Sequence, residues 1–157
     1  MEGLGGGRKD VLEICEELET LCAELYHHFA DLYKGERASM LLWLKTAMEA
    51  ENMAKQFALV GKLRRQKIIA SIEIDPDDAQ ITRMYVQSLL ERVRAAPPSL
   101  EEALRTAIRL EKNLAAFRIE NVVKFADQNY GRSFLATQSG GKQLESLQEA
   151  YDRLSSR

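Results

Sequence analysis

The stretch DVLEICEELETLCAELYHHFADLYK, residues 10–34, decides the fold. Its apolar side chains recur at intervals of three, four and seven residues, which places them on one face of an α-helix. Gly35 follows directly and is a typical helix end. The stretch therefore predicts a first amphipathic helix over about 10–34. The stripe that we expect to be buried consists of Leu12, Cys15, Cys22, Tyr26, Phe29 and Tyr33.

Three further stretches show the same helical spacing, over about 37–61, 99–128 and 132–154. The third of the four helices has the clearest start, because Ser99 and Glu102 have the spacing of a capping box. The pattern therefore predicts an all-α fold. The apolar stripe of the second helix consists of Met40, Trp43, Ala47, Ala50, Ala54 and Phe57.

A long connection, residues 62–98, separates the second predicted helix from the third. Its apolar, β-branched run Ile68–Ile74 favours an extended segment, and Asp75-Pro76 is a typical helix start. Short loops join antiparallel neighbours, whereas a long crossover lets the third helix run parallel to the second. This order predicts a ferritin-like four-helix bundle with an extra short helix in the crossover. The spacing of Ile81, Met84, Tyr85 and Leu89 indicates that extra helix, which should end near Arg94.

Length and charge limit the functional classes. The chain has 157 residues and a net charge of −2, with both signs interspersed. Residues 1–9 are glycine-rich and predict a flexible tail, and residues 10–157 predict a single bundle domain. We expect no nucleic-acid binding, because no strongly basic face is present, and no membrane span. We expect a cytoplasmic protein in which Cys15 and Cys22, about 10 Å apart along one helix, are buried and unpaired.

Two acidic residues fall inside the predicted apolar stripes. Glu19 shares a helix face with Cys15 and Cys22, and Glu111 shares one with Leu114. A buried carboxylate without a partner costs several kcal/mol or takes up a proton. Each glutamate could instead lie at the edge of its stripe and reach solvent. Their similar depth in two helices of a ferritin-like order favours one shared interior site.

Motifs in these helices resemble the rubrerythrin branch of the ferritin-like superfamily. Residues 19–30, ETLCAELYHHFA, are similar to the first-helix motif of the family, in which a ligand glutamate precedes Tyr-x-x-Phe-Ala. Residues 43–57, WLKTAMEAENMAKQF, resemble the second-helix motif around Glu-x-x-His-Ala. Leu104–Phe117 resembles the third-helix pattern around its ligand glutamate, and Leu144–Leu154 is loosely similar to the last helix. The resemblance implies a ferritin-like bundle with a dimetal site between its helices.

The resemblance also identifies the ligand positions of that site. Glu19 and Glu111 keep the carboxylates of the family. The other expected ligands are missing, and the thioether that replaces one of them prefers soft metals to iron. The resemblance therefore implies a degenerate dimetal site without a cofactor, or an iron site if it functions after all. The apparently lost ligand positions are Ala50, Met53, Gly140 and Gln143.

Arg118 is the candidate for charge replacement at this site. It lies one heptad after Glu111 on the same predicted stripe. Because helical side chains lean toward the N-terminus, its guanidinium can lean back toward Glu111. We hypothesise that it pairs with one or both interior carboxylates, since its charge is permanent and its fork matches a carboxylate. The alternative is that Arg118 reaches solvent.

Two other motifs have metal-ligand spacing. Glu49-x-x-Asn52 lies one residue from the expected register. Since one residue rotates a helix by about 100°, we expect it on a solvated polar face. Glu24-x-x-His27 could bind a surface metal, but a solvated face is the simpler interpretation. His28 is expected to be a partly buried packing residue or an interface residue.

The preferred functional interpretation is a rubrerythrin-like protein that has lost dimetal catalysis and acts as a structural or protein-interaction bundle. The resemblance implies a homodimer, and the protein partner remains open. One alternative is an iron-binding oxidoreductase of the rubrerythrin type with an atypical site at Glu19 and Glu111. Another is a small-ligand-binding bundle, because Gly140-Gly141 can break the fourth helix and open a pocket.

Overall fold

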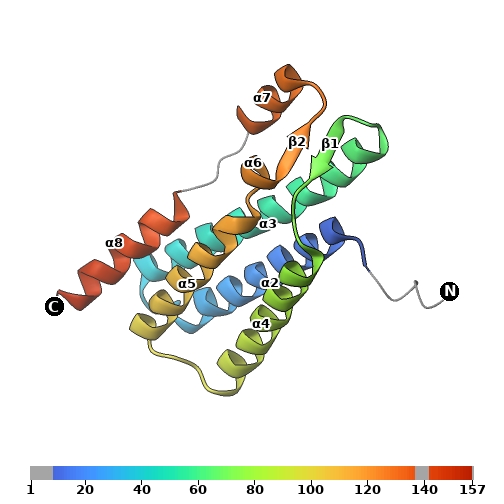
Figure 1. Ribbon diagram of the computed structural model, residues 1–157. Coiled ribbons are helices and arrows are strands. Elements are labelled where there is room, and N and C mark those ends of the chain that lie inside the picture. Colours follow the sequence, from blue (N-terminus) through green and yellow to red (C-terminus); the bar gives the residue numbers. More distant parts are fainter. Residues whose placement is uncertain (1–8, 137–141, 157) are drawn as a thin grey trace.

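The computed structural model describes residues 9–136 and 142–156, and most of these residues are helical. Figure 1 shows α2 and α8 running in one direction and α3 and α5 in the opposite direction. Helix α2 packs against α3 and α4, and α8 packs against α5 and α3. The first part of the chain consists of α2 (Val11–Leu32), α3 (Arg37–Arg65), β1 (Ile69–Ile72) and α4 (Pro76–Ala95). The second part consists of α5 (Leu100–Leu114), the 3₁₀ turn η1 (Ala115–Phe117), α6 (Ile119–Val122), β2 (Val123–Phe125), α7 (Gln128–Ala136) and α8 (Gln143–Ser155).

Helices α2 and α3 follow the sequence pattern closely. The stripe predicted for α2 is buried apart from half-buried Tyr33, and that of α3 is buried apart from half-buried Met40. The side chain of Glu36 caps α3 by accepting a hydrogen bond from the backbone N–H of Ser39. Tyr33 Oη donates to the carbonyl of Pro98 at 2.5 Å, which ties the end of α2 to the start of α5.

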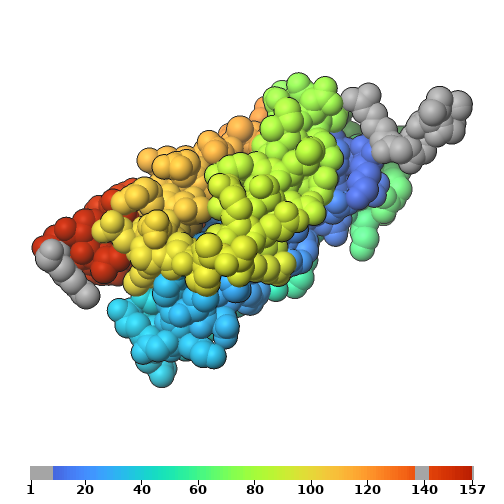
Figure 2. Space-filling model, turned by 90° about the horizontal axis from the view of Figure 1, so that it is seen from below, coloured from blue at the N-terminus to red at the C-terminus, as the bar shows by residue number. Residues whose placement is uncertain are grey.

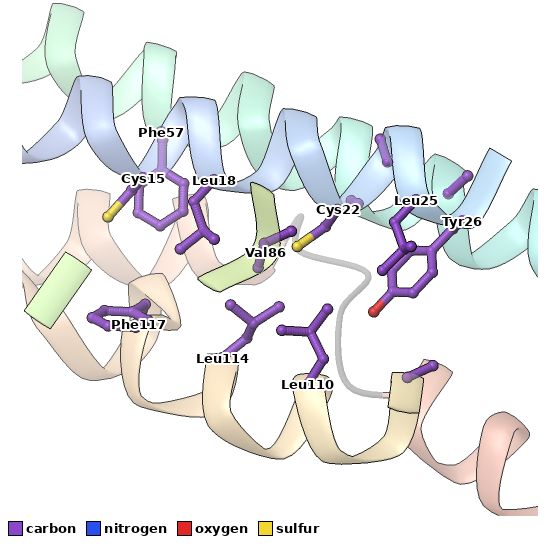
Figure 3. Close-up of a cluster of buried hydrophobic side chains, with 14 of the residues drawn as sticks. Cys15, Leu18, Cys22, Leu25, Tyr26, Phe57, Val86, Leu110, Leu114 and Phe117 are labelled. Atoms are coloured by element: carbon purple, nitrogen blue, oxygen red, sulfur yellow. The ribbon is translucent and has the colours of Figure 1, made fainter. Parts of the chain in front are cut away.

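The core lies between α2, α3 and α5. Figure 3 shows Cys22 and Tyr26 directed from α2 toward α5, which carries Leu110 and Leu114. These side chains are fully or almost fully buried. Burial of a large apolar side chain contributes about 1.5–3 kcal/mol, so this contact is a main source of stability. It also places the interior carboxylates on facing helices.

Helix α4 has the start and the end that the sequence predicted for the crossover helix, at Asp75-Pro76 and near Arg94. It extends over 20 residues and packs along α2. Of the four apolar residues that indicated this helix, Ile81, Met84 and Tyr85 are exposed and only Leu89 is buried. Helix α4 carries apolar residues on two faces, and periodicity cannot say which face α2 will cover. The buried face consists of Ala79, Val86, Leu89, Leu90 and Val93.

The third predicted helix is shorter than expected. Helix α5 starts with the predicted Ser99–Glu102 capping box but ends at Leu114, not near residue 128. The backbone of Arg118 is extended, with ψ of 137°, and the following chain forms α6 and β2. Strand β2 pairs antiparallel with β1, which confirms the extended segment expected in the crossover. Pairing with a distant strand therefore outweighs helix continuation here.

The fourth predicted helix, 132–154, is not continuous. Helix α7 ends at Ala136 and α8 begins at Gln143, and the glycine pair 140–141 lies outside the described residues. Helix α7 lies against β2, where a Cβ on Gly131 would approach Phe125 Cδ1 to 3.0 Å. Glycine thus permits a close contact that a larger residue would disturb. Within the described ranges, no helix has the length and apolarity that a membrane crossing requires.

Candidate functional site

Glu19 lies in the interior of the molecule, on the core-facing side of α2. Its side chain is 8% exposed, which excludes the interpretation that it reaches solvent at the edge of the stripe. Burial raises the pKa of Glu19 well above its ordinary value. The nearby charge of Glu111 raises this pKa further, whereas Arg118 lowers it. Glu19 therefore favours its protonated form.

Glu111 faces Glu19 from α5 and is held by two hydrogen bonds. Tyr26 Oη donates to Glu111 Oε2 at 2.6 Å, and Gln143 Nε2 donates to Glu111 Oε1 at a longer distance of 3.5 Å. Figure 3 shows the Tyr26 hydroxyl directed from α2 toward α5. Burial raises the pKa of Glu111, and the bonds from Tyr26 and Gln143 and the charge of Arg118 oppose that shift. The ionised carboxylate of Glu111 is thus better stabilised than that of Glu19.

The two carboxyl groups line one small cavity of about 30 Å³. Such a volume holds roughly one water molecule. The positions that the family resemblance assigned to lost ligands converge on the same cavity, except Gly140, which lies outside the described residues. The lining consists of Glu19, Thr46, Glu49, Ala50, Met53, Glu111, Leu114, Ala115, Phe117, Arg118 and Gln143.

Two polar lining residues, Thr46 and Glu49, were not assigned to the site from the sequence. Glu49 was expected on a solvated polar face, but it is half-buried and forms part of the cavity wall. Thr46 is buried, and its hydroxyl donates to the carbonyl of Leu42 in the preceding turn. Both lie on the α3 face that includes Ala50 and Met53, at intervals of three, four and seven residues. This helical spacing could have placed both residues at the site, but the polarity of Glu49 favoured the prediction of a solvated face.

Arg118 lines the cavity but does not pair with the interior carboxylates as hypothesised. Its Nε donates to Glu120 Oε1 at 2.5 Å, and its side chain is 26% exposed. The hypothesis assumed a helix that continues past Glu111 to Arg118, whereas α5 ends at Leu114. The guanidinium charge nevertheless lowers the pKa of both Glu19 and Glu111. Its influence is therefore exerted through space rather than through a hydrogen-bonded ion pair.

The donor set of the cavity does not fit a dimetal centre. Such centres in helical bundles use imidazoles beside carboxylates, and the described lining contains no histidine. Across residues 9–136 and 142–156, no group of three or more His, Cys, Asp or Glu side chains could hold a metal ion. A metal would also have to displace Tyr26 and Gln143 from Glu111. The arrangement can instead hold a proton on Glu19, because burial and the charge of Glu111 both raise its pKa.

The histidines do not line this cavity, and the two cysteines lie on the same buried face of α2 as Glu19. His27 Nε2 is 3.5 Å from Glu51 on α3, and Glu24 is 3.6 Å from Arg94 on α4, so each contacts a neighbouring helix. His28 is half-buried, as expected, and its Nε2 has no hydrogen-bond partner among the described residues. The two cysteines, Cys15 and Cys22, are free and buried, as predicted. Burial raises the pKa of Cys15 to about 12, which leaves an unreactive thiol.

No protein-family model, no curated protein and no solved structure matches this chain.

Proposed function

We propose that this chain is a rubrerythrin-like, ferritin-like bundle in which a proton-holding carboxyl pair has replaced the metal pair. In this proposal it acts as a structural or protein-interaction bundle and not as an enzyme. The observation that carries the proposal is the cavity between Glu19 and Glu111, because its α3 and α8 walls bear Ala50, Met53 and Gln143. These are the positions where the resemblance requires a glutamate and two further ligands.

Electrostatics supports replacement of the metal by a proton. Two buried carboxylates repel each other, so they need either a cation or a proton between them. Glu19 is the group whose pKa rises most clearly, through burial and through the charge of Glu111. Glu111 in turn accepts from the neutral donors Tyr26 and Gln143. A single proton on Glu19 then removes the repulsion of the pair without any metal, and the site specifies how α2, α5 and α8 pack.

Metal content is the direct test of this proposal. The full chain, purified without a histidine tag, is incubated anaerobically with Fe²⁺, Mn²⁺ or Zn²⁺, dialysed and analysed for bound metal. We expect far less than one ion per chain and no shift in the thermal unfolding midpoint, because a tightly bound ion stabilises the folded state. Stoichiometric retention of any of these ions between the helices would refute the proposal.

A restoration variant makes the test sharper. Ala50→Glu, Met53→His and Gln143→His together return carboxylate and imidazole ligands to the cavity wall. We expect this triple variant to bind metal that the natural chain does not, with an increase in thermal stability on loading. A matched control places the same Glu-x-x-His spacing on the exposed face of α3 through Met48→Glu and Glu51→His. Equal metal binding by the control and the triple variant would show that the cavity positions favour metal no more than an exposed helix face does.

One observation favours a second candidate, an atypical metal-dependent oxidoreductase. Glu49 brings a third carboxyl group to the wall of the cavity that Glu19 and Glu111 line. In this alternative the three carboxylates, which do not form a metal-ligating group as they lie in the described structure, draw together around a single iron. It predicts stoichiometric iron that is lost in Glu49→Gln, together with peroxide-dependent turnover. The small-ligand alternative receives no such support, since ligand pockets usually measure about 300–1,000 Å³ and this cavity measures about 30 Å³.

A further inference from the structure

The outer face of α4 exposes an apolar strip that the bundle does not use. Ile81 is 66% exposed, Met84 is 56% exposed and Tyr85 is 37% exposed. Intervals of three and four residues place these side chains together on one side of the helix. Figure 2 shows α4 lying across the near surface of the molecule, where a partner can reach it. The opposite face of α4 is buried against α2.

The residues on this face form a palindrome. We define the α4 stripe as the exposed set Asp77, Ile81, Met84, Tyr85, Ser88 and Arg92. The intervals along it are four, three, one, three and four residues, the same from either end. This symmetric spacing lets each member of the stripe lie level with another member when a second copy runs antiparallel, as in an isologous twofold interface. A helix paired antiparallel with its own copy has this symmetry.

Charge selects the antiparallel orientation. The first turn of α4 is acidic, with Asp77 and Asp78, and the last turn is basic, with Arg92 and Arg94. In an antiparallel pair Asp77 of each copy lies level with Arg92 of the other, and Ile81 lies level with Ser88. A parallel pair would place like charges together, which is unfavourable.

The basic residues of α4 differ in availability. The side chain of Arg83 donates to Gln80 and Gln87, and Arg94 lies 3.6 Å from Glu24. Within the described part of the chain, no side-chain hydrogen bond or ion pair engages the guanidinium of Arg92. Arg92 is therefore the cation on this helix that a second copy can bind without breaking a contact inside the first.

We propose that α4 is a self-docking helix, against which a second copy of this chain packs antiparallel about a twofold axis between Met84 and Tyr85. The apolar side chains Ile81, Met84 and Tyr85 of both copies lie at its centre, and the Asp77–Arg92 pairs close its two ends. The inference stands independently of whether the interior cavity binds metal. An interface of one helix per copy is small, so its dissociation constant falls in the range of transient contacts.

Sedimentation equilibrium of the full chain tests the interface, at concentrations up to about 1 mM. We expect a reversible monomer–dimer equilibrium that Met84→Glu weakens by about tenfold or more, because it places charges at the apolar centre. The matched control is Met48→Glu on α3, which changes an equally exposed methionine (59%) and should leave association unchanged. A chain that stays monomeric, or equal effects of the two substitutions, overturns the proposal.

A charge-exchange experiment tests the antiparallel orientation. Asp77→Arg sets two guanidinium groups level with each other at each end of the pair, and Arg92→Asp sets two carboxylates there. Each single variant should therefore associate about tenfold more weakly than the natural chain. Mixing the two single variants allows a heterodimer to form. Its repulsion is relieved at both ends, because each end then holds one positive and one negative side chain.

The composition of the mixture gives the readout. In the mixed dimer one end sets the new arginine against the new aspartate, and the other end keeps the natural Asp77–Arg92 pair. Heterodimers should therefore predominate over either homodimer, and the double variant should recover the natural association. If mixing produces no enrichment of heterodimers, the antiparallel arrangement is wrong.

Discussion

The two halves of the molecule differ in how continuous their helices are. Helices α2 and α3 run without interruption for 22 and 29 residues. Beyond Pro98, α5 stops after 15 residues, and a 3₁₀ turn, a strand and short helices precede α8. In the first half, local periodicity and tertiary burial select the same helix face. In the second half the apolar residues Phe117, Ile119 and Val123 are buried by contacts with segments distant in sequence. Local periodicity therefore does not determine the secondary structure there.

The two interior acids reflect the same difference. Within the described residues Glu19, from the regular half, has no hydrogen-bond partner. Glu111, from the interrupted half, accepts from Tyr26 and Gln143. Gln143 at the start of α8 supplies one of these hydrogen bonds, and Tyr26 on the regular helix α2 supplies the shorter one. The polar support of Glu111 therefore comes from both halves of the molecule.

The largest expected effect comes from paired core truncations. Phe29→Ala, in α2, removes a fully buried ring that packs 4.8 Å from the ring of Trp43. It should lower the free energy of unfolding by about 3–5 kcal/mol. Phe134→Ala, in α7, should cost about half as much or less, because α7 packs mainly on β2 and can adjust. Urea unfolding measures both, and equal costs would contradict the view that the second half is less tightly specified.

An intermediate effect is expected when Glu19 is neutralised by Glu19→Gln. The folded pKa of Glu19 lies above its unfolded value, so the folded state binds more protons at intermediate pH. Stability should therefore be greatest below the ordinary glutamate pKa of 4.5 and fall as pH rises toward the folded pKa. Glu19→Gln should remove this fall. At neutral pH the variant should therefore be more stable than the natural chain, by about 1–3 kcal/mol in the free energy of unfolding.

Controls for this titration are available on the same helix and across the cavity. Glu13→Gln changes an exposed residue of α2 and should leave the pH dependence of stability in place. Glu111→Gln should flatten it less than Glu19→Gln does, because Tyr26 and Gln143 already oppose the rise in the pKa of Glu111. If Glu19→Gln unfolds with the same pH profile as the natural chain, Glu19 does not hold the proton.

The smallest effect is expected for Arg118→Leu. Loss of the guanidinium raises the pKa values of Glu19 and Glu111 further, since its charge lowers both. Stability should decrease by about 1 kcal/mol or less at neutral pH and remain unchanged at low pH, where both acids are protonated. Arg118→Lys keeps the charge and is the matched control. Identical pH profiles for Arg118→Leu, Arg118→Lys and the natural chain would exclude any charge replacement by this residue.

Much of the fold could be predicted from the sequence, and the candidate site only in outline. Periodicity located α2, α3, the start of α5 and the extended segment before α4. The helical spacing also indicated that Glu19 points inward, and the family resemblance selected the positions that gather around the cavity. Glu49 was placed on the wrong face, and Arg118 was given the wrong partner. The first error came from assuming that the polar side of a helix must face water, and the second from assuming that the third helix continues to Arg118, whereas α5 ends at Leu114.

The sequence by itself determined where helices begin and which carboxyl groups enter the core, because caps and apolar repeats act within a few residues. The tertiary structure alone decided that α5 ends at Leu114, that α4 buries its Val86 face and that Gln143 reaches Glu111. These outcomes depend on pairing and packing between distant segments, whose free energy is gained only when the whole chain is assembled.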